Sequence, residues 1–318
     1  MTPLRLLADI GGTNIRLAWQ DRPGGPLHDA RVLPCAQFPT VEAAIAAYLA
    51  EVNIATPREA ALGIANPVTG DTVRMTNHSW CFSQQALKES LGLQRLVVIN
   101  DFTALALTLP TLTLAQLRQV GGGAAVPGCA VALVGPGTGL GVSGLVYPPG
   151  ASAGVPLAGE GGHVTLAAQT PLEHEVLAIL QARYGHVSAE RAVCGAGLVD
   201  LYHAVRQLVG QAGVEVSAAA QVSERALQAQ DPVALQAMEL FCGFLGSVAG
   251  NLALTLGARG GVYLGGGMVA RWGAWFDQSP FRARFEAKGR FQPYLASLLS
   301  GQNPNKINWL AEGDGWCL

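Results

Sequence analysis

Short apolar runs alternate with glycine-rich polar turns along this chain, and the clearest example lies near the N-terminus. A largely apolar run over residues 4–10 leads to the turn Gly11-Gly12-Thr13-Asn14, and a second apolar run over residues 15–18 follows it. This pattern predicts a β-hairpin whose tip carries no large side chains. Glycines at the tip let the backbone approach a bulky anion, and its N–H groups can point at phosphate oxygens. The predicted phosphate turn consists of Ala8, Asp9, Ile10, Gly11, Gly12 and Thr13.

The same pattern recurs in the middle of the chain. An apolar run over residues 130–134 leads to Gly135-Pro136-Gly137-Thr138-Gly139, and residues 140–146 form the apolar run that follows. Either hairpin alone is also compatible with an ordinary tight turn. Two copies, each with a threonine after its glycines, favour two related halves that each offer a phosphate turn to one nucleotide. The second predicted phosphate turn includes Gly135, Gly137, Thr138 and Gly139.

Asp9 is an unexpected residue directly before a phosphate turn, because its carboxylate would repel a bare phosphate. A Mg²⁺ ion between the carboxylate and the phosphate resolves the conflict, since Mg²⁺ keeps several of its water ligands and bridges to phosphates. We therefore expect Asp9 to hold Mg²⁺ indirectly, through water.

Helices and strands are predicted to alternate through both halves of the chain. Helices are expected over residues 41–52, from 84 to Gly92, over 102–109, from 171 to about 185, in a short segment after Ser188, and from 232 onward. Strands are expected over 60–65, 96–99 and 261–264. Caps support several of these helices, above all Thr170-Pro171-Leu172-Glu173, which has the residues of a capping box. The alternation predicts an α/β architecture with a ligand cleft between two domains.

Domain boundaries and a third glycine-rich turn follow from the same pattern. Pro110 is a plausible hinge, so we expect a small α/β domain over residues 1–110 and a large one over 111–300, with residues 301–318 as an atypical C-terminal tail. The predicted strand 261–264 ends at Gly265 and Gly266, which suit a surface where a flat adenine ring meets backbone. Turns rich in glycine are common, however, so an ordinary turn is the alternative there.

Composition narrows the classes of function. The 318 residues are 50% hydrophobic and 13% charged, with a net charge of −2 and no run of basic residues. These features argue against nucleic acid or an anionic membrane as the partner and favour a small substrate. The six cysteines lie far apart without a C-x-x-C pair, which indicates reduced thiols in a cytosol rather than disulfides or a zinc site. The N-terminus lacks a signal-peptide pattern, and the uncharged run over 240–258 is interrupted by Gly243, Gly246, Gly250 and Asn251 and fits a buried helix.

Asp101 is the leading candidate for a catalytic group. It follows the predicted buried strand 96–99 and the adjacent Asn100, at a point where an unpaired carboxylate would be costly. From the end of such a strand Asp101 can accept the proton of a substrate hydroxyl as that oxygen attacks phosphorus. Phosphoryl transfer depends mainly on positioning and charge stabilisation, so the base need not be strong. The alternative is that Asp101 is the N-cap of the helix that follows, and the two roles are compatible.

Glu160, His163 and Glu190 lie in glycine-rich or helix-start segments and carry the donors and acceptors that recognise hydroxyl groups. Polar groups that converge on several hydroxyls would select a sugar. Each residue also has a structural interpretation: Glu160 as a loop charge, His163 as a core histidine, and Glu190 as a first-turn helix residue. A metal role for His163 is disfavoured because no cluster of cysteines lies near it.

The motifs taken together resemble those of the bacterial glucokinases of the hexokinase/actin-like superfamily, in unbroken order over roughly residues 4–292. The resemblance rests on residues 8–14, 75–80, 99–104, 135–141, 159–164, 185–191 and 260–268. Related repressor/kinase proteins of the superfamily carry a cysteine-rich zinc motif after the equivalent histidine, and its absence here favours the glucokinase branch.

The resemblance implies a fold, an activity and a set of roles. The fold would be the two-domain actin-like ATPase (ribonuclease H-like) fold with an interdomain cleft that closes over the sugar. The activity would be transfer of a phosphoryl group from ATP to the 6-hydroxyl of glucose, with Asp101 as base and Asn100, Glu160, His163 and Glu190 on the sugar. Both glycine turns would hold the ATP phosphates. The protein would be a cytoplasmic homodimer.

Two other functions remain open at this stage. One is a sugar-binding regulator or inactive paralogue without catalysis, and the other is a kinase for another hexose or another acceptor. Residues 300–318 bear on this question because they do not resemble the strand and glycine-containing helix with which family members usually end.

Overall fold

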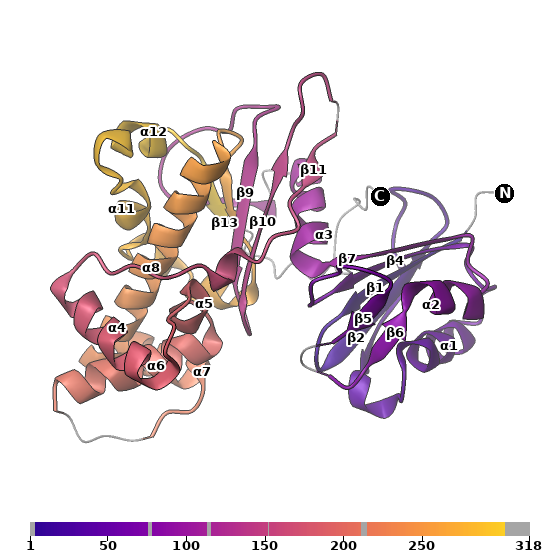
Figure 1. The fold of residues 1–318 in the computed structure, drawn as a ribbon, viewed down its shortest axis with the longest axis horizontal. Coiled ribbons are helices and arrows are strands. Elements are labelled where there is room, and N and C mark those ends of the chain that lie inside the picture. Colours follow the sequence, from indigo (N-terminus) through magenta and orange to yellow (C-terminus); the bar gives the residue numbers. More distant parts are fainter. Residues whose placement is uncertain (1–3, 76–77, 113–115, 152, 211–214, 303–318) are drawn as a thin grey trace. The chain divides into compact units, whose positions relative to one another are not determined.

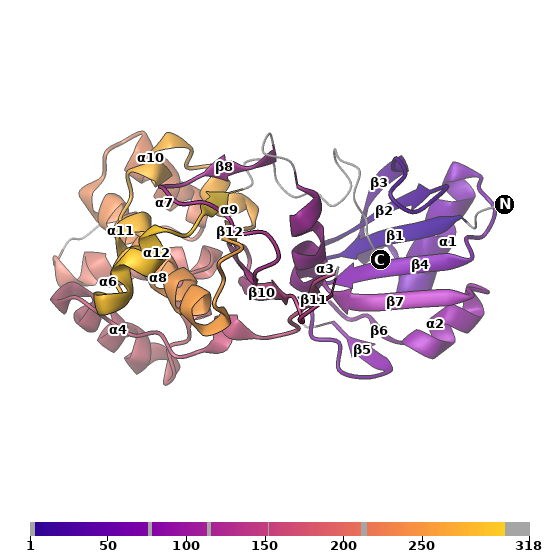
Figure 2. The same ribbon diagram turned by 90° about the horizontal axis from the view of Figure 1, so that it is seen from above.

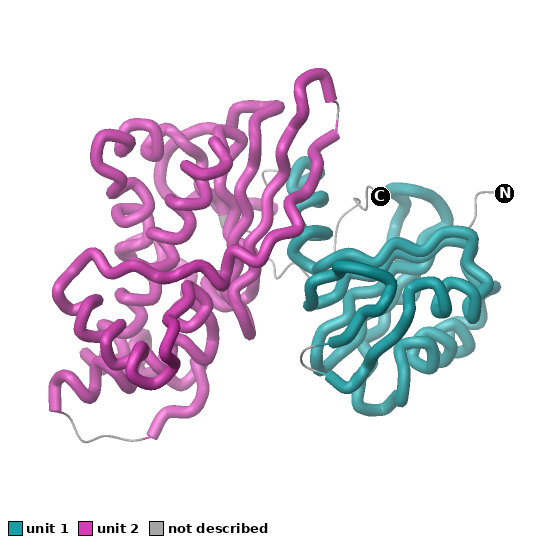
Figure 3. The backbone as a smooth tube through the Cα atoms, viewed as in Figure 1, with its two compact units in different colours: residues 1–113, 307–318 teal, residues 114–306 magenta. Residues whose placement is uncertain are grey.

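The computed structural model describes residues 4–75, 78–112, 116–151, 153–210 and 215–302. The chain divides between residues 113 and 114 into two compact units, which we call unit 1 and unit 2 and describe separately (Figure 3). Thr76 and Asn77 of the 75–80 motif, and the tail from residue 303, lie outside the described residues.

Unit 1 is built on a five-stranded sheet in the order β3-β2-β1-β4-β7, which Figure 2 shows side by side. The predicted first hairpin is confirmed, since β1 (Arg5–Ile10) pairs antiparallel with β2 (Asn14–Gln20) in a register that places Ile10 opposite Ile15. β3 (His28–Pro34) extends the hairpin on the outer side of β2. β4 (Glu59–Ile64) and β7 (Arg95–Asn100) follow on the other side of β1, and both run parallel to it.

The helices of unit 1 begin at capped positions. α1 (Val41–Val52) starts after Thr40, whose Oγ1 accepts from Ala43 N at 3.2 Å, and α2 (Gln84–Ser90) starts after Ser83. Apolar residues of α1 and α2 pack with alternate residues of β1 and β4 in the main core of the unit. The remaining elements are the η1 turn (Cys35–Gln37), the small hairpin of β5 (Thr72–Arg74) and β6 (Cys81–Ser83), α3 (Asp101–Thr108) and the η2 turn (Leu109–Thr111).

Unit 2 contains a six-stranded sheet in the order β11-β10-β9-β12-β13-β8. The second predicted hairpin is also confirmed, with β9 (Val131–Pro136) antiparallel to β10 (Leu140–Val146). β12 (Val262–Leu264) runs parallel to β9, and β13 (Ser300–Gln302) runs parallel to β12. Two short strands complete the edges, β8 (Arg118–Gln119) and β11 (Val155–Pro156).

Helices make up most of the rest of unit 2 (Figure 1). In chain order the helical elements are the η4 turn (Gly161–His163), α4 (Pro171–Tyr184), α5 (Ala189–Ala192), α6 (Gly195–Leu208), α7 (Ala219–Leu227), α8 (Pro232–Leu256), α9 (Gly267–Ala270), α10 (Ala274–Asp277), α11 (Phe281–Glu286), the η5 turn (Gly289–Phe291) and α12 (Gln292–Ala296). The predicted capping box at the start of α4 is present, with Glu173 N bonded to Thr170 Oγ1 and Glu173 Oε2 accepting from Thr170 N.

α8 is the central helix of unit 2. Its length and composition would allow it to cross a membrane, but 83% of its most apolar window is buried within the protein. This confirms the expectation of a buried helix over the uncharged run. α11 packs closely on α8 at Gly246, where a Cβ atom would lie 2.4 Å from the backbone oxygen of Phe281.

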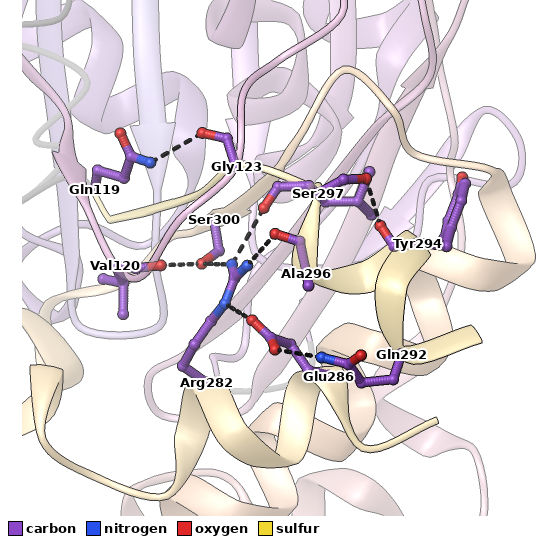
Figure 4. Close-up of polar contacts among 11 residues, drawn as sticks. Gln119, Val120, Gly123, Arg282, Glu286, Gln292, Tyr294, Ala296, Ser297 and Ser300 are labelled. Atoms are coloured by element: carbon purple, nitrogen blue, oxygen red, sulfur yellow. Dashed lines mark hydrogen bonds and ion pairs between the residues drawn. The ribbon is translucent and has the colours of Figure 1, made fainter. Parts of the chain in front are cut away.

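Arg282 of α11 connects the last described strand to the helical part of unit 2 (Figure 4). Its guanidinium donates to Glu286 Oε1 at 2.5 Å, to Ser300 Oγ at 2.8 Å and to the carbonyl of Ala296 at 2.9 Å. Ser300 in turn donates its hydroxyl proton to the carbonyl of Val120, beside β8. These contacts hold β13 in the sheet through side chains as well as through its backbone ladder.

The packing of α8 on α11 predicts opposite effects for one substitution at two neighbouring glycines. Gly246→Ala should destabilise the protein by about 1–3 kcal/mol, because the added methyl overpacks backbone that cannot rotate away. Gly243→Ala is the matched control, since the nearest atom to its Cβ would be 3.7 Å away. There alanine should be neutral or stabilise by about 0.5–1 kcal/mol through its higher helix propensity. Thermal denaturation midpoints that shift equally in both variants would contradict this account.

Candidate active site

The tip of the first hairpin is held by a cysteine from the η1 turn. Gly11 N donates to Asn14 O at 3.0 Å and closes the turn, while Cys35 N donates to Thr13 O at 2.9 Å. The Cys35 thiol donates to Gly11 O at 3.5 Å. Burial raises the pKa of this thiol, so it stays protonated and remains a donor. Cys35 therefore contacts the predicted phosphate turn on both sides of Gly12.

Asp9 faces Arg16 across the same hairpin. The two residues are direct cross-strand partners, and Arg16 Nη1 lies 2.7 Å from Asp9 Oδ2. Asp9 is only 7% exposed. Burial raises the pKa of its carboxyl group, and the charge and hydrogen bond of Arg16 lower it in part, so that the net direction is upward. The fold thus keeps a carboxylate beside the turn in a place where its ionised form is disfavoured.

Three parallel strands of unit 1 end at one edge of the sheet. Ile10 of β1 is aligned with Ile64 of β4, and Ile64 is aligned with Asn100 of β7. The glycine turn after β1 and Asp101 after β7 therefore begin at the same level, with β4 between them. Two strand spacings correspond to about 10 Å. Unit 1 consequently carries the predicted phosphate turn and the predicted base on the same edge.

The N-cap of α3 is Asn100 and not Asp101, so the alternative role suggested for Asp101 from sequence is wrong. Asn100 Oδ1 accepts from Thr103 N at 3.1 Å, and Asn100 Nδ2 donates to the carbonyl of Asn66 at 3.3 Å. Asp101 is the first residue of α3, and its Oδ1 accepts from Phe102 N at 2.8 Å. The partial positive charge of the helix N-terminus favours the ionised form of a carboxylate at this position.

Three segments of unit 2 meet at the tip of the second hairpin. Gly137 N donates to Gly139 O at 2.8 Å and closes the turn, and Gly195 N at the start of α6 donates to Gly137 O at 2.9 Å. Gly265 N donates to the carbonyl of Val134 in the parallel neighbour β9. Gly266 follows with a φ of +81°, and a Cβ atom there would lie 2.4 Å from Pro136 O. The third glycine-rich turn is therefore in contact with the second.

Glu190 of α5 reaches the same hairpin from the other side. Its Oε2 accepts a hydrogen bond from Leu140 N at 2.8 Å. The carboxylate lies so close to Gly139 that a Cβ atom on this residue would be 2.5 Å from Oε2. A larger residue at position 139 would therefore displace the carboxylate of Glu190, which occupies this space.

Glu160 and His163 belong to a segment that packs on β10. His163 N donates to Glu160 O at 3.0 Å within the η4 turn, and both residues are exposed. A Cβ atom on Gly162 would lie 2.3 Å from Leu140 O, so the turn rests against the start of β10. The segment then contacts the start of α5, since Ala189 N donates to the carbonyl of Val164 at 2.8 Å and Leu166 N donates to the carbonyl of Val187 at 3.0 Å. The structure thus brings Glu160, His163 and Glu190 to the same end of β10.

The predicted site residues are divided between the two units. Unit 1 carries Ala8 to Thr13, Asn100 and Asp101, whereas unit 2 carries both glycine turns of its sheet together with Glu160, His163 and Glu190. Within the described residues no group of three or more His, Cys, Asp or Glu side chains is placed to hold a metal ion. Asp9 is the carboxylate beside a phosphate turn, and a single carboxylate suits Mg²⁺ that keeps water and phosphate ligands.

Sequence reasoning missed several of the supporting residues. Arg16 had a usable signal, because the predicted hairpin register places it opposite Asp9. Cys35 and Gly195 had none, since they reach their turns across long stretches of chain.

Comparison with known proteins places these features in context. A family model described as glucokinase matches residues 6–300. The chain is 57% identical over 295 residues to a protein named glucokinase from Aromatoleum aromaticum, an alignment that covers 92% of this chain and 88% of that protein. Among solved structures, the glucokinase from an Antarctic psychrotroph matches with a TM-score of 0.85 and 34% identity, covering 95% of this chain and 94% of that one.

A more distant structure shares the fold alone. It is a ROK family glucokinase from Streptomyces griseus in complex with glucose and AMPPNP, with a TM-score of 0.62 and 22% identity over 94% of each chain. These matches confirm the predicted fold class, an α/β fold with two sheets that corresponds to the actin-like ATPase architecture.

The raised pKa of Asp9 predicts that Asp9→Asn does not lower the stability of the protein at pH 7. A folded-state pKa above the ordinary value means that the folded protein binds the proton more tightly than the unfolded chain, so ionised Asp9 costs stability as the pH rises. Asparagine removes that cost, and Arg16 is sufficiently exposed to remain solvated. The gain should disappear at acid pH, where wild-type Asp9 is protonated.

Asp71→Asn is the matched control, because hydrogen bonds from Ser83 and from the backbone of Gln85 lower the pKa of Asp71. The expected effect on stability at neutral pH therefore has the opposite sign. Denaturant unfolding across a range of pH measures both variants. A loss of stability in Asp9→Asn at neutral pH would mean that the pair with Arg16 outweighs the burial of the charge.

Proposed function

Because this chain belongs to the glucokinase family, we propose that it transfers the γ-phosphoryl group of ATP to the 6-hydroxyl of glucose and yields glucose 6-phosphate. The observation that carries the proposal is the aligned edge of the unit 1 sheet. There the glycine turn follows β1 and Asp101 follows β7, and these two strands end at one level, separated by two strand spacings of about 10 Å in total. This spacing leaves room for a transferring phosphoryl group and the hydroxyl that attacks it.

Asp101 would accept the proton of the 6-hydroxyl as the new oxygen–phosphorus bond forms and the bond to ADP breaks. As the first residue of α3, Asp101 lies at the helix N-terminus, whose partial positive charge interacts favourably with an ionised carboxylate, the state that a proton acceptor requires. Most of the rate would come from positioning and from backbone N–H groups of the two glycine turns on the phosphates. We assign these turns to ATP, with Gly265 and Gly266 beside the adenine.

Glucose would be bound by Asn100 of unit 1 and by Glu160, His163 and Glu190 of unit 2. Carboxylates, an imidazole and an amide provide acceptors and donors for several hydroxyls, and such a set favours a polyol over an acidic substrate. Glu160 and His163 are exposed, and the carboxylate of Glu190 has bonding capacity beyond its contact with Leu140. The Streptomyces griseus structure, which contains glucose and AMPPNP, supports a sugar and a nucleotide as the two ligands.

Mg²⁺ is the metal that this donor set would accept, with Asp9 as an indirect ligand through water. When bound, the ion would neutralise charge on the ATP phosphates. The pairing with Arg16 fixes the Asp9 carboxylate and would limit its repulsion of the phosphates.

We further infer a cytoplasmic homodimer in which residues 1–110 supply the first turn and the base, and residues 111–300 supply the second turn and the sugar site. The described cysteines are all free thiols, which is consistent with a reducing compartment. Sedimentation of the purified protein tests the oligomeric state.

A coupled assay with ATP and a panel of hexoses tests the proposed activity. Glucose should be the best acceptor, with product formation abolished by a chelator and restored by excess Mg²⁺. Turnover with fructose or mannose but not glucose would indicate a kinase for another hexose. Calorimetric binding of glucose by folded protein that turns over no hexose would indicate a regulator or an inactive paralogue.

Asp101→Asn should lower turnover by about 10²–10⁴-fold, because the variant cannot accept a proton in the transition state. Glucose affinity should change little, since most of the sugar contacts are assigned to other residues. Glu42→Gln is the matched control, an acidic residue in the first turn of α1 in the same unit, and should retain wild-type turnover. Near-normal turnover in Asp101→Asn would show that another group is the base.

A further inference from the structure

The position of Glu190 between the sugar site and the second glycine turn gives this residue a role beyond sugar binding. Its Oε2 accepts from Leu140 N at 2.8 Å, directly after Gly139. A Cβ atom placed on Gly139 would lie 2.5 Å from Oε2 of this carboxylate but 4.0 Å from Oε1. One oxygen is therefore turned toward the turn and the other away from it. In the described part of the chain, Oε1 accepts no hydrogen bond.

α5, which carries Glu190, is held firmly on both sides. Ser188 Oγ caps the helix by accepting from Arg191 N, and Ala189 N donates to the segment that follows His163. The guanidinium of Arg191 lies 4.3 Å from the centre of the Tyr184 ring.

Tyr184 is itself fixed, because its hydroxyl donates to Asp200 Oδ2 at 2.6 Å. Asp200 is buried on α6, the helix whose first residue, Gly195, donates to Gly137 O. A path of packed and hydrogen-bonded groups thus leads from Glu190 through α5 and α6 back to the turn.

The second glycine turn depends on these contacts for its shape. Its internal bond joins Gly137 N to Gly139 O, and its external bonds come from Gly195 N on one side and from the Glu190 carboxylate at Leu140 on the other. Apart from Pro136, at the end of β9, and Thr138, the turn carries no side chain that could pack against a neighbour. A shift of the carboxylate would therefore change the direction of the backbone N–H groups in the turn.

We propose that Glu190 couples the two substrates within unit 2: the carboxylate binds glucose through Oε1 and orients the ATP-binding turn through Oε2. Glucose fixes the carboxylate, the fixed carboxylate orders the turn, and the ordered turn binds the nucleotide more tightly. Coupling of this kind is reciprocal, so ATP must raise the affinity for glucose by the same factor. The inference rests on the proposed function, because it requires both ligands.

Calorimetric titration of the whole protein with AMPPNP and Mg²⁺, with and without saturating glucose, measures the coupling factor. For the wild type we expect glucose to tighten AMPPNP binding by about 5–150-fold. In Gly139→Ala the methyl group displaces the carboxylate while Glu190 stays chemically intact, and the factor should fall at least severalfold. Gly137→Ala is the matched control, since its Cβ would meet no atom within 4 Å. Gly137→Ala can change the affinity for AMPPNP itself, but the ratio of its AMPPNP affinities with and without glucose should equal that of the wild type.

If Gly139→Ala does not fold, two substitutions of Glu190 test the coupling independently. Glu190→Gln keeps an acceptor for Leu140 N and should retain most of the coupling with weaker glucose binding, whereas Glu190→Ala should lose the coupling. A wild-type factor in Gly139→Ala or in Glu190→Ala would overturn the inference and leave the proposed function intact. Wild-type protein that binds no glucose would overturn both.

Discussion

Parallel pairing of β1, β4 and β7 determines where the chemistry of unit 1 takes place. Parallel strands end at the same edge of a sheet, and the register from Ile10 through Ile64 to Asn100 aligns the three ends. A slip of one residue in β7 would send its core-facing residues to the opposite face and displace Asp101 from the level of the glycine turn. The apolar packing of the sheet against α1 and α2 opposes such a slip. The position of the proposed base is thus a consequence of how the core packs.

In unit 1 the strand register positions the candidate site residues, whereas in unit 2 close contacts with the backbone position them. Gly139 lies against the carboxylate of Glu190, which a larger residue would displace, and Gly266 lies against the end of β9, where backbone leaves no room for a Cβ atom. These contacts bring the segment of Glu160 and His163, which we propose binds the sugar, together with the second and third turns at one end of the β9–β10 hairpin. The small residues that would let a phosphate approach the turn also let its neighbours approach, so we expect a change in one of these segments to affect the others.

Local patterns in the sequence predicted most of the elements that matter, and long-range contacts account for the rest. Both hairpins, the caps of α1 and α4, and the burial of α8 follow from short stretches of residue types, because periodicity and capping are local properties. The N-cap of α3 was wrongly assigned to Asp101 instead of Asn100, because both are good capping residues and only the backbone geometry distinguishes them. The second contact of Glu190 had no sequence signal, because Leu140 contributes a backbone N–H that any residue would supply.

At the proposed ATP site, backbone N–H groups and a metal ion would have to neutralise the negative charge of the phosphates. Neither glycine turn contains Lys or Arg, and Arg16, the basic residue nearest the first turn, is engaged with Asp9. A chain with 13% charged residues has few other cations to offer. Backbone N–H groups in a turn act as fixed partial charges that need no counter-charge when the site is empty. The arrangement explains why the turns need rigid neighbours such as Cys35 and Glu190, since N–H groups bind an anion well only when they are held in one direction.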